Sequence, residues 1–200
     1  MLQRGRLLSA TGSFDNAVAT YRRALARFEK LEDVRAQALT YSYLAPTYAE
    51  QNLVWKAFEA DRSAMTLCEL TGNEQRLGDL HINLGASFIL LASFEPARAH
   101  SAAALAIFRE TGDLQVEGYA LDQHGECLLG LGELTAGEAD MVEGLFLSRQ
   151  QGFSYGLLYN LPPWIRHLES CGRSSQALVA ADELLDIARD RDADHFVLSG

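Results

Sequence analysis

Histidine is the side chain in this sequence with the widest scope for acid–base and metal chemistry near neutral pH. The histidines are not spaced as H-x-x-x-H or H-E-x-x-H, the arrangements that place zinc ligands on one face of a helix. His81 occupies a position of an internal repeat that other copies fill with Tyr41 and Leu161, and His124 occupies one that they fill with Leu44 and Leu84, so packing accounts for both. His124 and Glu126, two residues apart, would point to different sides of a helix. The full set is His81, His100, His124, His167 and His195.

The cysteines also lack a reactive pattern. Cys68, Cys127 and Cys171 form no C-x-x-C pair, and three thiols cannot all pair within one chain. Each falls in a helical pattern, where cysteine commonly serves as a small apolar residue. The sequence also lacks G-x-S-x-G, a Walker-type phosphate loop and a dinucleotide fingerprint. We therefore expect no catalytic residue, no metal site, no cofactor and no enzymatic activity.

The elements that would position any functional residue follow an internal repeat of forty residues. Glycine or asparagine after an apolar stretch is typical of a helix end, because that position needs a left-handed backbone. Small polar residues after such turns are typical N-caps. One turn series lies at 31–33, 71–73, 111–113 and 151–153, and the other holds Gly12, Asn52, Ala92, Gly132 and Gly172. The predicted N-caps are Asp33, Asn73 and Asp113 after the first series, and Ser13, Ser93 and Ser174 after the second.

Apolar residues recur in the same register. Leu44, Ala45 and Tyr48 become Leu84, Gly85 and Phe88 one repeat later, which places a large, a small and a large residue on one helical face. Small residues also recur where two helices must approach closely. These are Ala17, Ala57, Ala97, Gly137 and Ala177, and, seven residues on, Ala24, Ala64, Ala104 and Gly144. Each repeat is therefore predicted to be a pair of helices of about 17–18 residues joined by tight turns.

In these positions the sequence resembles the tetratricopeptide repeat family, most closely in LGASFILLASFEPARAHSAAALAIF (84–108). The period exceeds the family's usual 34 residues and is similar to the extended repeats of some large bacterial regulators. The resemblance implies an all-α fold, an α-α superhelix (TPR-like solenoid) of antiparallel helix pairs in about five repeats. We expect a single domain over 1–200, as a segment of a longer protein. It would comprise a truncated first repeat (1–31), full repeats at 33–71, 73–111, 113–151 and 153–191, and the start of a further helix in 192–200.

Prolines interrupt two of the expected helices. Pro46 predicts a bend, and Pro162-Pro163 predicts a break, because an internal proline removes a backbone hydrogen bond at a cost of about 3 kcal/mol. Pro96 falls in a first turn, where proline is tolerated. Two readings of Pro46 and Pro162 stay open: a packing kink, or freed carbonyl groups that line a binding groove.

The resemblance also implies a concave groove lined by the first helix of each pair. Apolar and aromatic residues there would grip side chains of a partner, amides would bond its backbone, and acidic residues would favour a basic residue. Of the expected positions only Arg166 matches the carboxylate clamp of the family's co-chaperones, which argues against binding of Hsp70 or Hsp90 tails. The candidate groove residues are Ile82, Asn83, Ala86, Ile89, Tyr119, Asp122, Gln123, Glu126, Tyr159, Asn160 and Arg166.

Composition excludes several classes of partner. The net charge of −10 disfavours binding of nucleic acid. The longest apolar runs, such as SFILLASF (87–94), fall far short of the roughly 20 residues needed to span a bilayer, and the start lacks a signal peptide. We expect a cytoplasmic protein with no membrane partner.

Three functions fit these observations. The first is a scaffold that binds a protein or peptide in the groove, within a larger regulatory or signalling protein. The second is a regulatory domain that senses a small ligand or peptide. The third is self-assembly into a homo-oligomer through the ends of the repeat array, because residues 1–40 carry a charge of +3 (seven Lys/Arg, four Asp/Glu) and the rest carry −13.

Overall fold

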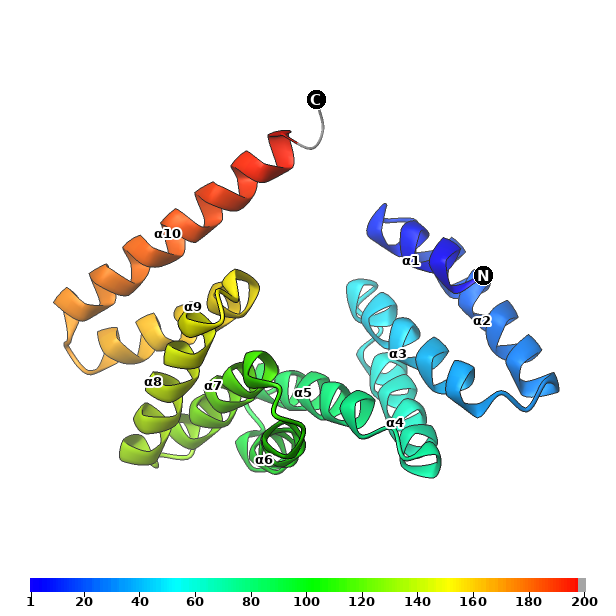
Figure 1. The fold of residues 1–200 in the computed structure, drawn as a ribbon, viewed down its shortest axis with the longest axis horizontal. Helices are drawn as coiled ribbons and strands as arrows, with labels where there is room; N and C mark the ends of the chain where they lie inside the picture. Colours follow the sequence, from blue (N-terminus) through cyan, green and yellow to red (C-terminus); the bar gives the residue numbers. More distant parts are fainter. Residues whose placement is uncertain (198–200) are drawn as a thin grey trace. The chain divides into compact units, whose positions relative to one another are not determined.

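The computed structural model describes residues 1–197, with side chains described through residue 190. Over this range the chain consists of helices joined by short turns, with no strand (Figure 1). This confirms the predicted all-α fold. The helices are α1 (Leu2–Ala10), α2 (Phe14–Lys30), α3 (Val34–Glu50), α4 (Val54–Thr71), α5 (Glu74–Leu90), α6 (Phe94–Thr111), α7 (Leu114–Gly130), α8 (Leu134–Gln150), α9 (Ser154–Ser170) and α10 (Ser174–Val197).

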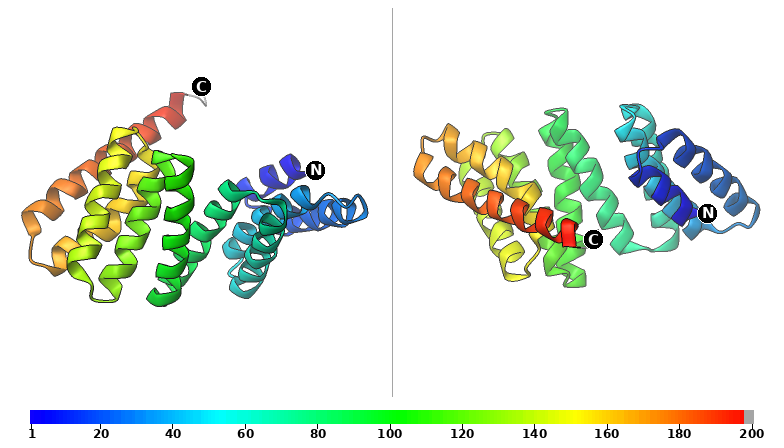
Figure 2. Two further views of the ribbon diagram at one scale, coloured as in Figure 1. Left: turned by 60° about the horizontal axis from the view of Figure 1, so that its bottom comes forward. Right: turned by 90° about the horizontal axis from the view of Figure 1, so that it is seen from above.

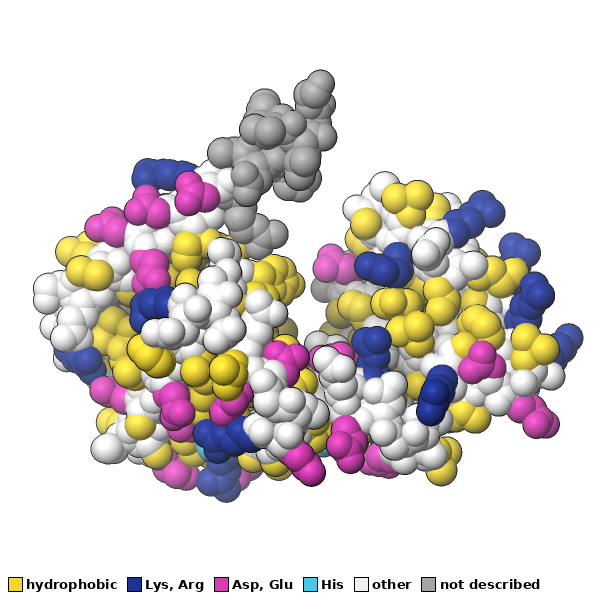
Figure 3. Space-filling view, in the orientation of Figure 1, with side chains coloured by type: hydrophobic (Ala, Val, Ile, Leu, Met, Phe, Trp, Pro, Cys, Tyr) yellow, Lys and Arg dark blue, Asp and Glu magenta, His cyan; other side chains and the backbone are white. Residues whose placement is uncertain are grey.

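The chain forms two compact units, Met1–Leu84 and Gly85–Gly200, whose boundary falls inside α5. From α1 to α4 and from α6 to α10, helices that follow one another in sequence pack side by side, as α7 and α8 do in Figure 2. On the face shown in Figure 3, Lys and Arg side chains are frequent over α1–α4, in agreement with the positive charge of that end of the sequence. None of the described helices is long and apolar enough to cross a membrane.

The turns fall at the predicted positions, one every twenty residues. Each of the predicted glycines in these turns has a positive φ. Three other residues adopt the same left-handed backbone: Glu32 (φ 55°), Asn52 (φ 57°) and Ala92 (φ 52°). The left-handed backbone conformation therefore recurs at every turn of the forty-residue repeat, even where the residue type is unfavourable.

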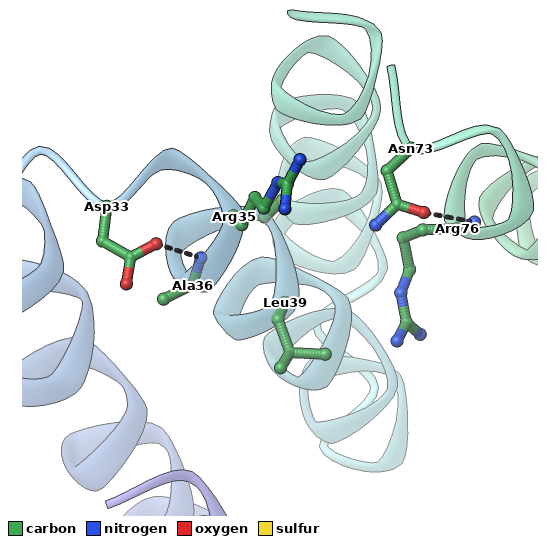
Figure 4. Close-up of a pocket in the computed structure, with 7 residues that line it drawn as sticks. Asp33, Arg35, Ala36, Leu39, Asn73 and Arg76 are labelled. Carbon is green, nitrogen blue, oxygen red and sulfur yellow. Dashed lines mark hydrogen bonds between the residues drawn. The ribbon is translucent and has the colours of Figure 1, made fainter. Parts of the chain in front are cut away.

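Capping differs between the two turn series. Asp33 Oδ1 accepts a hydrogen bond from the Ala36 amide at 3.0 Å, and Asn73 Oδ1 accepts one from the Arg76 amide at 3.2 Å (Figure 4). Asp113 caps α7 in the same way, so the three predicted caps of this series are confirmed.

The predicted serine caps are wrong. Ser13 and Ser93 stand at the N-cap positions of α2 and α6 but make no side-chain cap bond, and Ser174 lies inside α10. The ψ angles of Ser13 and Ser93 are 58° and 72°, against 83° and 81° at Asp33 and Asp113. Serine is a common N-cap, so the residue type alone does not secure the cap bond.

The core of each unit lies between its paired helices. In Met1–Leu84 it includes Tyr21, Leu44, Tyr48 and Leu80, and in the second unit it includes Met141, Leu145, Leu161, Trp164 and Leu168. The helices α7 and α8 approach most closely at glycines, because a Cβ on Gly144 would lie only 2.6 Å from the carbonyl oxygen of Gly118. The close approach predicted at Gly137 and Gly144 is confirmed.

The two helices with a proline beyond the first turn continue through it. Helix α3 includes Pro46, and whether it bends there stays a prediction. Helix α9 includes Pro162 and Pro163, so the predicted break is wrong. Buried Leu157 and Leu161 before the prolines, and Trp164 and Leu168 after them, belong to one core cluster. Packing on both sides holds the helical path despite the two missing N–H groups.

Two further expectations are wrong. Helix α10 runs through the boundary predicted after residue 191 to Val197; residues 198–200 lie outside the described range. Cys68 and Cys127 are buried, as predicted for apolar fillers, but Cys171 is exposed at the end of α9.

Replacing Ala92 with glycine is expected to stabilise the protein by about 0.5–1 kcal/mol, because an L-residue at φ 52° is strained and glycine is not. The control is Ala102→Gly at an exposed position within α6, where glycine should cost about 1 kcal/mol. Urea unfolding of both variants measures the two shifts. Equal destabilisation by both would show that the turn carries no strain.

Candidate binding pocket

A pocket of about 720 Å³ lies on one face of the second unit. Helices α7 and α9 form most of its wall, and the end of α5 and the start of α6 complete it. The forty-residue register explains this convergence, since Tyr119 and Tyr159 occupy one repeat position, and Ala86, Glu126 and Arg166 another. The lining residues are Ala86, Ile89, Leu90, Phe94, Tyr119, Asp122, Gln123, Glu126, Leu158, Tyr159, Asn160, Pro162, Pro163 and Arg166.

Tyrosines of α7 and α9 form an aromatic cluster at this pocket. The rings of Tyr119 and Tyr159 meet edge to face with centroids 6.3 Å apart, and Tyr155 lies 4.8 Å from Tyr159. The Tyr155 hydroxyl donates to that of Tyr159 at 3.2 Å. Burial raises the pKa of Tyr119 to about 12, so its phenol stays neutral at physiological pH. Tyr159 is half exposed and offers ring surface to a ligand.

The charged residues of the pocket largely neutralise one another. Arg166 Nη2 donates to Glu126 Oε1 at 2.8 Å. The two residues occupy the same repeat position, Arg166 on α9 and Glu126 on α7. Burial raises the pKa of the Glu126 carboxyl, and the neighbouring Arg166 opposes that rise. A basic ligand would therefore have to compete with Arg166 for Glu126.

Asp122 is a buried carboxyl at the crossing of α7 and α8. Its exposed fraction is 2%, and neither carboxyl oxygen has a hydrogen-bond partner among the described residues. Burial raises the pKa of Asp122 well above its ordinary value, an effect that Arg149 partly opposes. A Cβ on Gly144 would lie 2.7 Å from Asp122 Cγ, so the carboxyl packs against α8. Burial thus shifts Asp122 toward the neutral acid relative to an exposed aspartate.

Two amide side chains line the same pocket. Asn160 is 3% exposed, and its Nδ2 has no partner within the described part of the chain. Such a donor costs about 1–3 kcal/mol while it stays unpaired. The Gln123 side chain fills the space above Gly85, where a Cβ would overlap its Oε1. Asn160 is thus a candidate donor for a ligand that reaches it.

The remaining wall is apolar and includes unusual backbone. Leu90 is 87% exposed, which leaves a large aliphatic side chain available at the rim. Pro162 and Pro163 have no N–H group, so the carbonyls of Leu158 and Tyr159 lose the donors that a regular helix would supply. All four residues line the pocket, and the two carbonyl groups are candidate acceptors for a ligand N–H.

Nine of the eleven residues predicted from sequence line this pocket. The other two, Ile82 and Asn83, belong to the first unit, and Ile82 is buried. Sequence reasoning missed Leu90, Phe94 and Leu158, and it left open the role of Pro162 and Pro163. The Pro162-Pro163 pair was the sequence signal for this part of the wall, because it frees backbone carbonyl groups on the face of α9 that carries Tyr159.

A second hollow, of about 450 Å³, lies in the first unit between the starts of α3 and α5 (Figure 4). Its polar residues include Asp33 and Asn73, whose side-chain oxygens already cap those helices. No buried polar atom without a partner lies among its described lining residues. The second unit therefore offers the better candidate site.

Known proteins resemble this chain in structure rather than in sequence. No family model matches it, and no curated protein sequence matches it. BtubC (BKLC) from P. vanneervenii has a TM-score of 0.74 at 20% identity over 94% of this chain and 78% of that chain. The nearly identical TPR-like repeats of a Podosopora anserina putative kinesin light chain have a TM-score of 0.70 at 12% identity over 95% of this chain and 94% of that chain.

A Rap protein complexed with Competence and Sporulation Factor gives a TM-score of 0.76 at 16% identity, over 98% of this chain and 55% of the Rap chain. Identities this low establish the fold alone. With the helix pairs and the turn rhythm, these likenesses show that the chain has a TPR-like helical repeat fold.

Proposed function

We propose that this chain is a protein–protein interaction scaffold that binds a peptide or an extended segment of a protein in the pocket of its second unit. The Asn160 amide supports this most directly, because it is buried, unpartnered and part of a wall with exposed aromatic and aliphatic groups. Pockets that combine apolar walls with a few placed polar groups are typical ligand sites. We further propose that the scaffold is cytoplasmic and belongs to a larger regulatory or signalling protein.

The chemistry of the wall favours a ligand with a large apolar side chain and a free backbone. Tyr159 and Leu90 provide the exposed ring and the aliphatic surface. Asn160 Nδ2 would donate to a ligand carbonyl, and the carbonyls freed by Pro162-Pro163 would accept from ligand N–H groups. The Glu126–Arg166 ion pair leaves little net charge, so a basic ligand residue is not required. The chain's charge of −10 argues against nucleic acid or an anionic membrane as partner.

Binding accounts for the pocket better than catalysis. Its titratable groups are Tyr119, whose pKa burial raises to about 12, the buried Asp122, the ion pair of Glu126 and Arg166, and the Tyr159 phenol. None of them lies beside a described nucleophile in the pocket lining. The Rap protein solved with Competence and Sporulation Factor shows one protein of this fold with a bound factor, in keeping with a binding role here.

A sensing role is the second candidate. The pocket draws on three successive repeats within one unit, so a small ligand or signalling peptide there would contact α5, α7 and α9 together. Such a ligand would favour one spacing of these helices over others. Protection of α5, α7 and α9 amides from hydrogen exchange by a short peptide alone would distinguish a sensor from a scaffold for folded partners.

Panning a library of unconstrained displayed peptides on the whole chain tests the binding role. We expect enriched peptides to carry an aromatic or large aliphatic residue. Tyr159→Ala and Leu90→Ala should each weaken their binding by roughly tenfold or more, since truncation of a central apolar contact costs about 2 kcal/mol. Fluorescence anisotropy of labelled peptides gives the dissociation constants.

Phe146→Ala is the matched control. Phe146 is an exposed aromatic residue of α8 in the same unit, and it does not line the pocket. Its truncation should leave peptide affinity within about twofold. No enrichment, or peptides that depend on Phe146 and not on Tyr159, would refute the proposal.

A further inference from the structure

Three metal-ligating side chains meet where α8 crosses the end of α9. His167 Nε2 lies 2.8 Å from Glu138 Oε1 and 3.7 Å from Cys171 Sγ. The three candidate ligand atoms all fall within 4.8 Å of one another. None of these residues lines the candidate binding pocket. The cluster therefore calls for an explanation of its own.

We propose that Glu138, His167 and Cys171 form a binding site for a thiophilic divalent cation, for which Zn²⁺ is the best fit. The donor set is one carboxylate oxygen, one imidazole nitrogen and one thiolate sulfur. Zn²⁺ accepts all three donor types, whereas Ca²⁺ and Mg²⁺ require oxygen ligands. Three protein ligands leave a fourth tetrahedral position for water.

Two of the three ligand pairs already lie near the spacing of a tetrahedral zinc site. His167 and Cys171 are four residues apart at the end of α9, so their side chains lie on one face of that helix. Zinc bonds of about 2.0–2.3 Å at tetrahedral angles separate neighbouring ligand atoms by about 3.3–3.7 Å. The observed 3.7 Å between Sγ and Nε2 meets that spacing, and the 2.8 Å hydrogen bond to Glu138 has to open only slightly.

Neighbouring side chains orient the ligands. The Trp164 ring stacks on the His167 imidazole with centroids 5.7 Å apart, and His167 is only 8% exposed. Arg173 Nη1 donates to Glu138 Oε2 at 2.9 Å, which leaves Oε1 to face the imidazole. Such outer contacts fix ligand geometry in metal sites.

Loading of the ion has a defined proton balance. Bonds form from the ion to Oε1, Nε2 and Sγ, and the S–H bond of Cys171 breaks, with its proton released to the buffer. Nε2 of His167 must also give up its proton. That proton goes to the buffer, or the ring changes to the tautomer that carries its proton on Nδ1. Binding should therefore tighten as pH rises.

Titration of the reduced whole chain with Co²⁺ tests the site, because a cobalt–thiolate bond gives a near-ultraviolet charge-transfer band. We expect the band to saturate at one Co²⁺ per chain and to disappear on addition of Zn²⁺. Cys171→Ser should abolish the band, and Glu138→Gln should weaken Zn²⁺ binding by roughly tenfold or more. Asp140→Asn is the matched control, since Asp140 lies on the same helix but pairs with His124.

Cys171 is exposed, so its replacement should leave the fold intact, and circular dichroism verifies this. Light scattering measures the mass of the loaded chain. A monomer excludes a site shared between two chains. Absence of the band in the wild-type chain, or its persistence in Cys171→Ser, would overturn the proposal. An equal rise in thermal midpoint with Zn²⁺ in wild type and Cys171→Ser would overturn it as well.

Discussion

Replacing Asp61 with serine should raise the free energy of unfolding by about 2–4 kcal/mol above pH 7. Asp61 lies in α4 with an exposed fraction of 5%, and its Oδ1 has no hydrogen-bond partner among the described residues. Burial raises its pKa from 3.8 to about 7. Ser101 occupies the same position of the next repeat and donates to the Arg98 carbonyl at 3.1 Å, so serine is compatible with this place in the fold.

The gain should depend on pH. Below about pH 4 Asp61 is protonated in both the folded and the unfolded chain, so it imposes no ionisation penalty. Between about pH 4 and pH 7 the unfolded chain loses this proton and the folded chain keeps it, so wild-type stability falls as pH rises. The slope approaches about 1.4 kcal/mol per pH unit and levels off above pH 7, whereas Asp61→Ser should lack this contribution.

Urea unfolding at several pH values measures this difference. Glu59→Gln is the matched control, because Glu59 is an exposed acidic residue of the same helix and its removal should shift stability little. A constant difference between Asp61→Ser and wild type from pH 4 to pH 8 would mean that Asp61 is ionised in the folded protein. In that case its burial would have to be relieved by water or by movement of α4.

The sequence carries most of the fold because its repeat signals are local and redundant. A left-handed turn residue recurs every twenty positions, and small residues mark each helix crossing, so an unfavourable residue such as Ala92 does not disturb the register. The serine caps failed although serine is a common N-cap: Ser13 and Ser93 stand at the N-cap positions but make no side-chain cap bond. Residue type alone does not fix where the hydroxyl of a cap residue points.

The pocket was predictable only as far as the register reaches. Tyr119, Glu126 and Arg166 follow from counting forty residues along a helix face. Leu90 and Phe94 depend instead on how the α5–α6 turn meets the face of α7 and α9. The prediction of a break at Pro162-Pro163 was wrong because it rested on the low helix propensity of proline alone. It did not include the core contacts of Leu161 and Trp164. Tertiary packing outweighed the local cost of the prolines.

The crossing of α7 and α8 should be the place least tolerant of added volume in the second unit. A Cβ at Gly144 would meet the Gly118 carbonyl oxygen at 2.6 Å and Asp122 Oδ1 at 2.9 Å. Backbone atoms cannot rotate away as a side chain can, so the helices must separate. Gly144→Ala is therefore expected to lower the free energy of unfolding by about 2–3 kcal/mol, although alanine favours the helix by about 1 kcal/mol.

The same substitution at Gly156 is the control for Gly144→Ala. A Cβ there would meet the ring of Phe153 at 2.5 Å, and this half-buried side chain can move, so Gly156→Ala should be close to neutral. Separation of α7 from α8 also shifts Tyr119 and Gln123, which line the pocket on α7. Gly144→Ala should thus weaken binding of panned peptides while Gly156→Ala leaves it unchanged. If Gly144→Ala is as stable as wild type, the two helices do not pack backbone to backbone. The position of α7 in the pocket wall would then differ from the one described here.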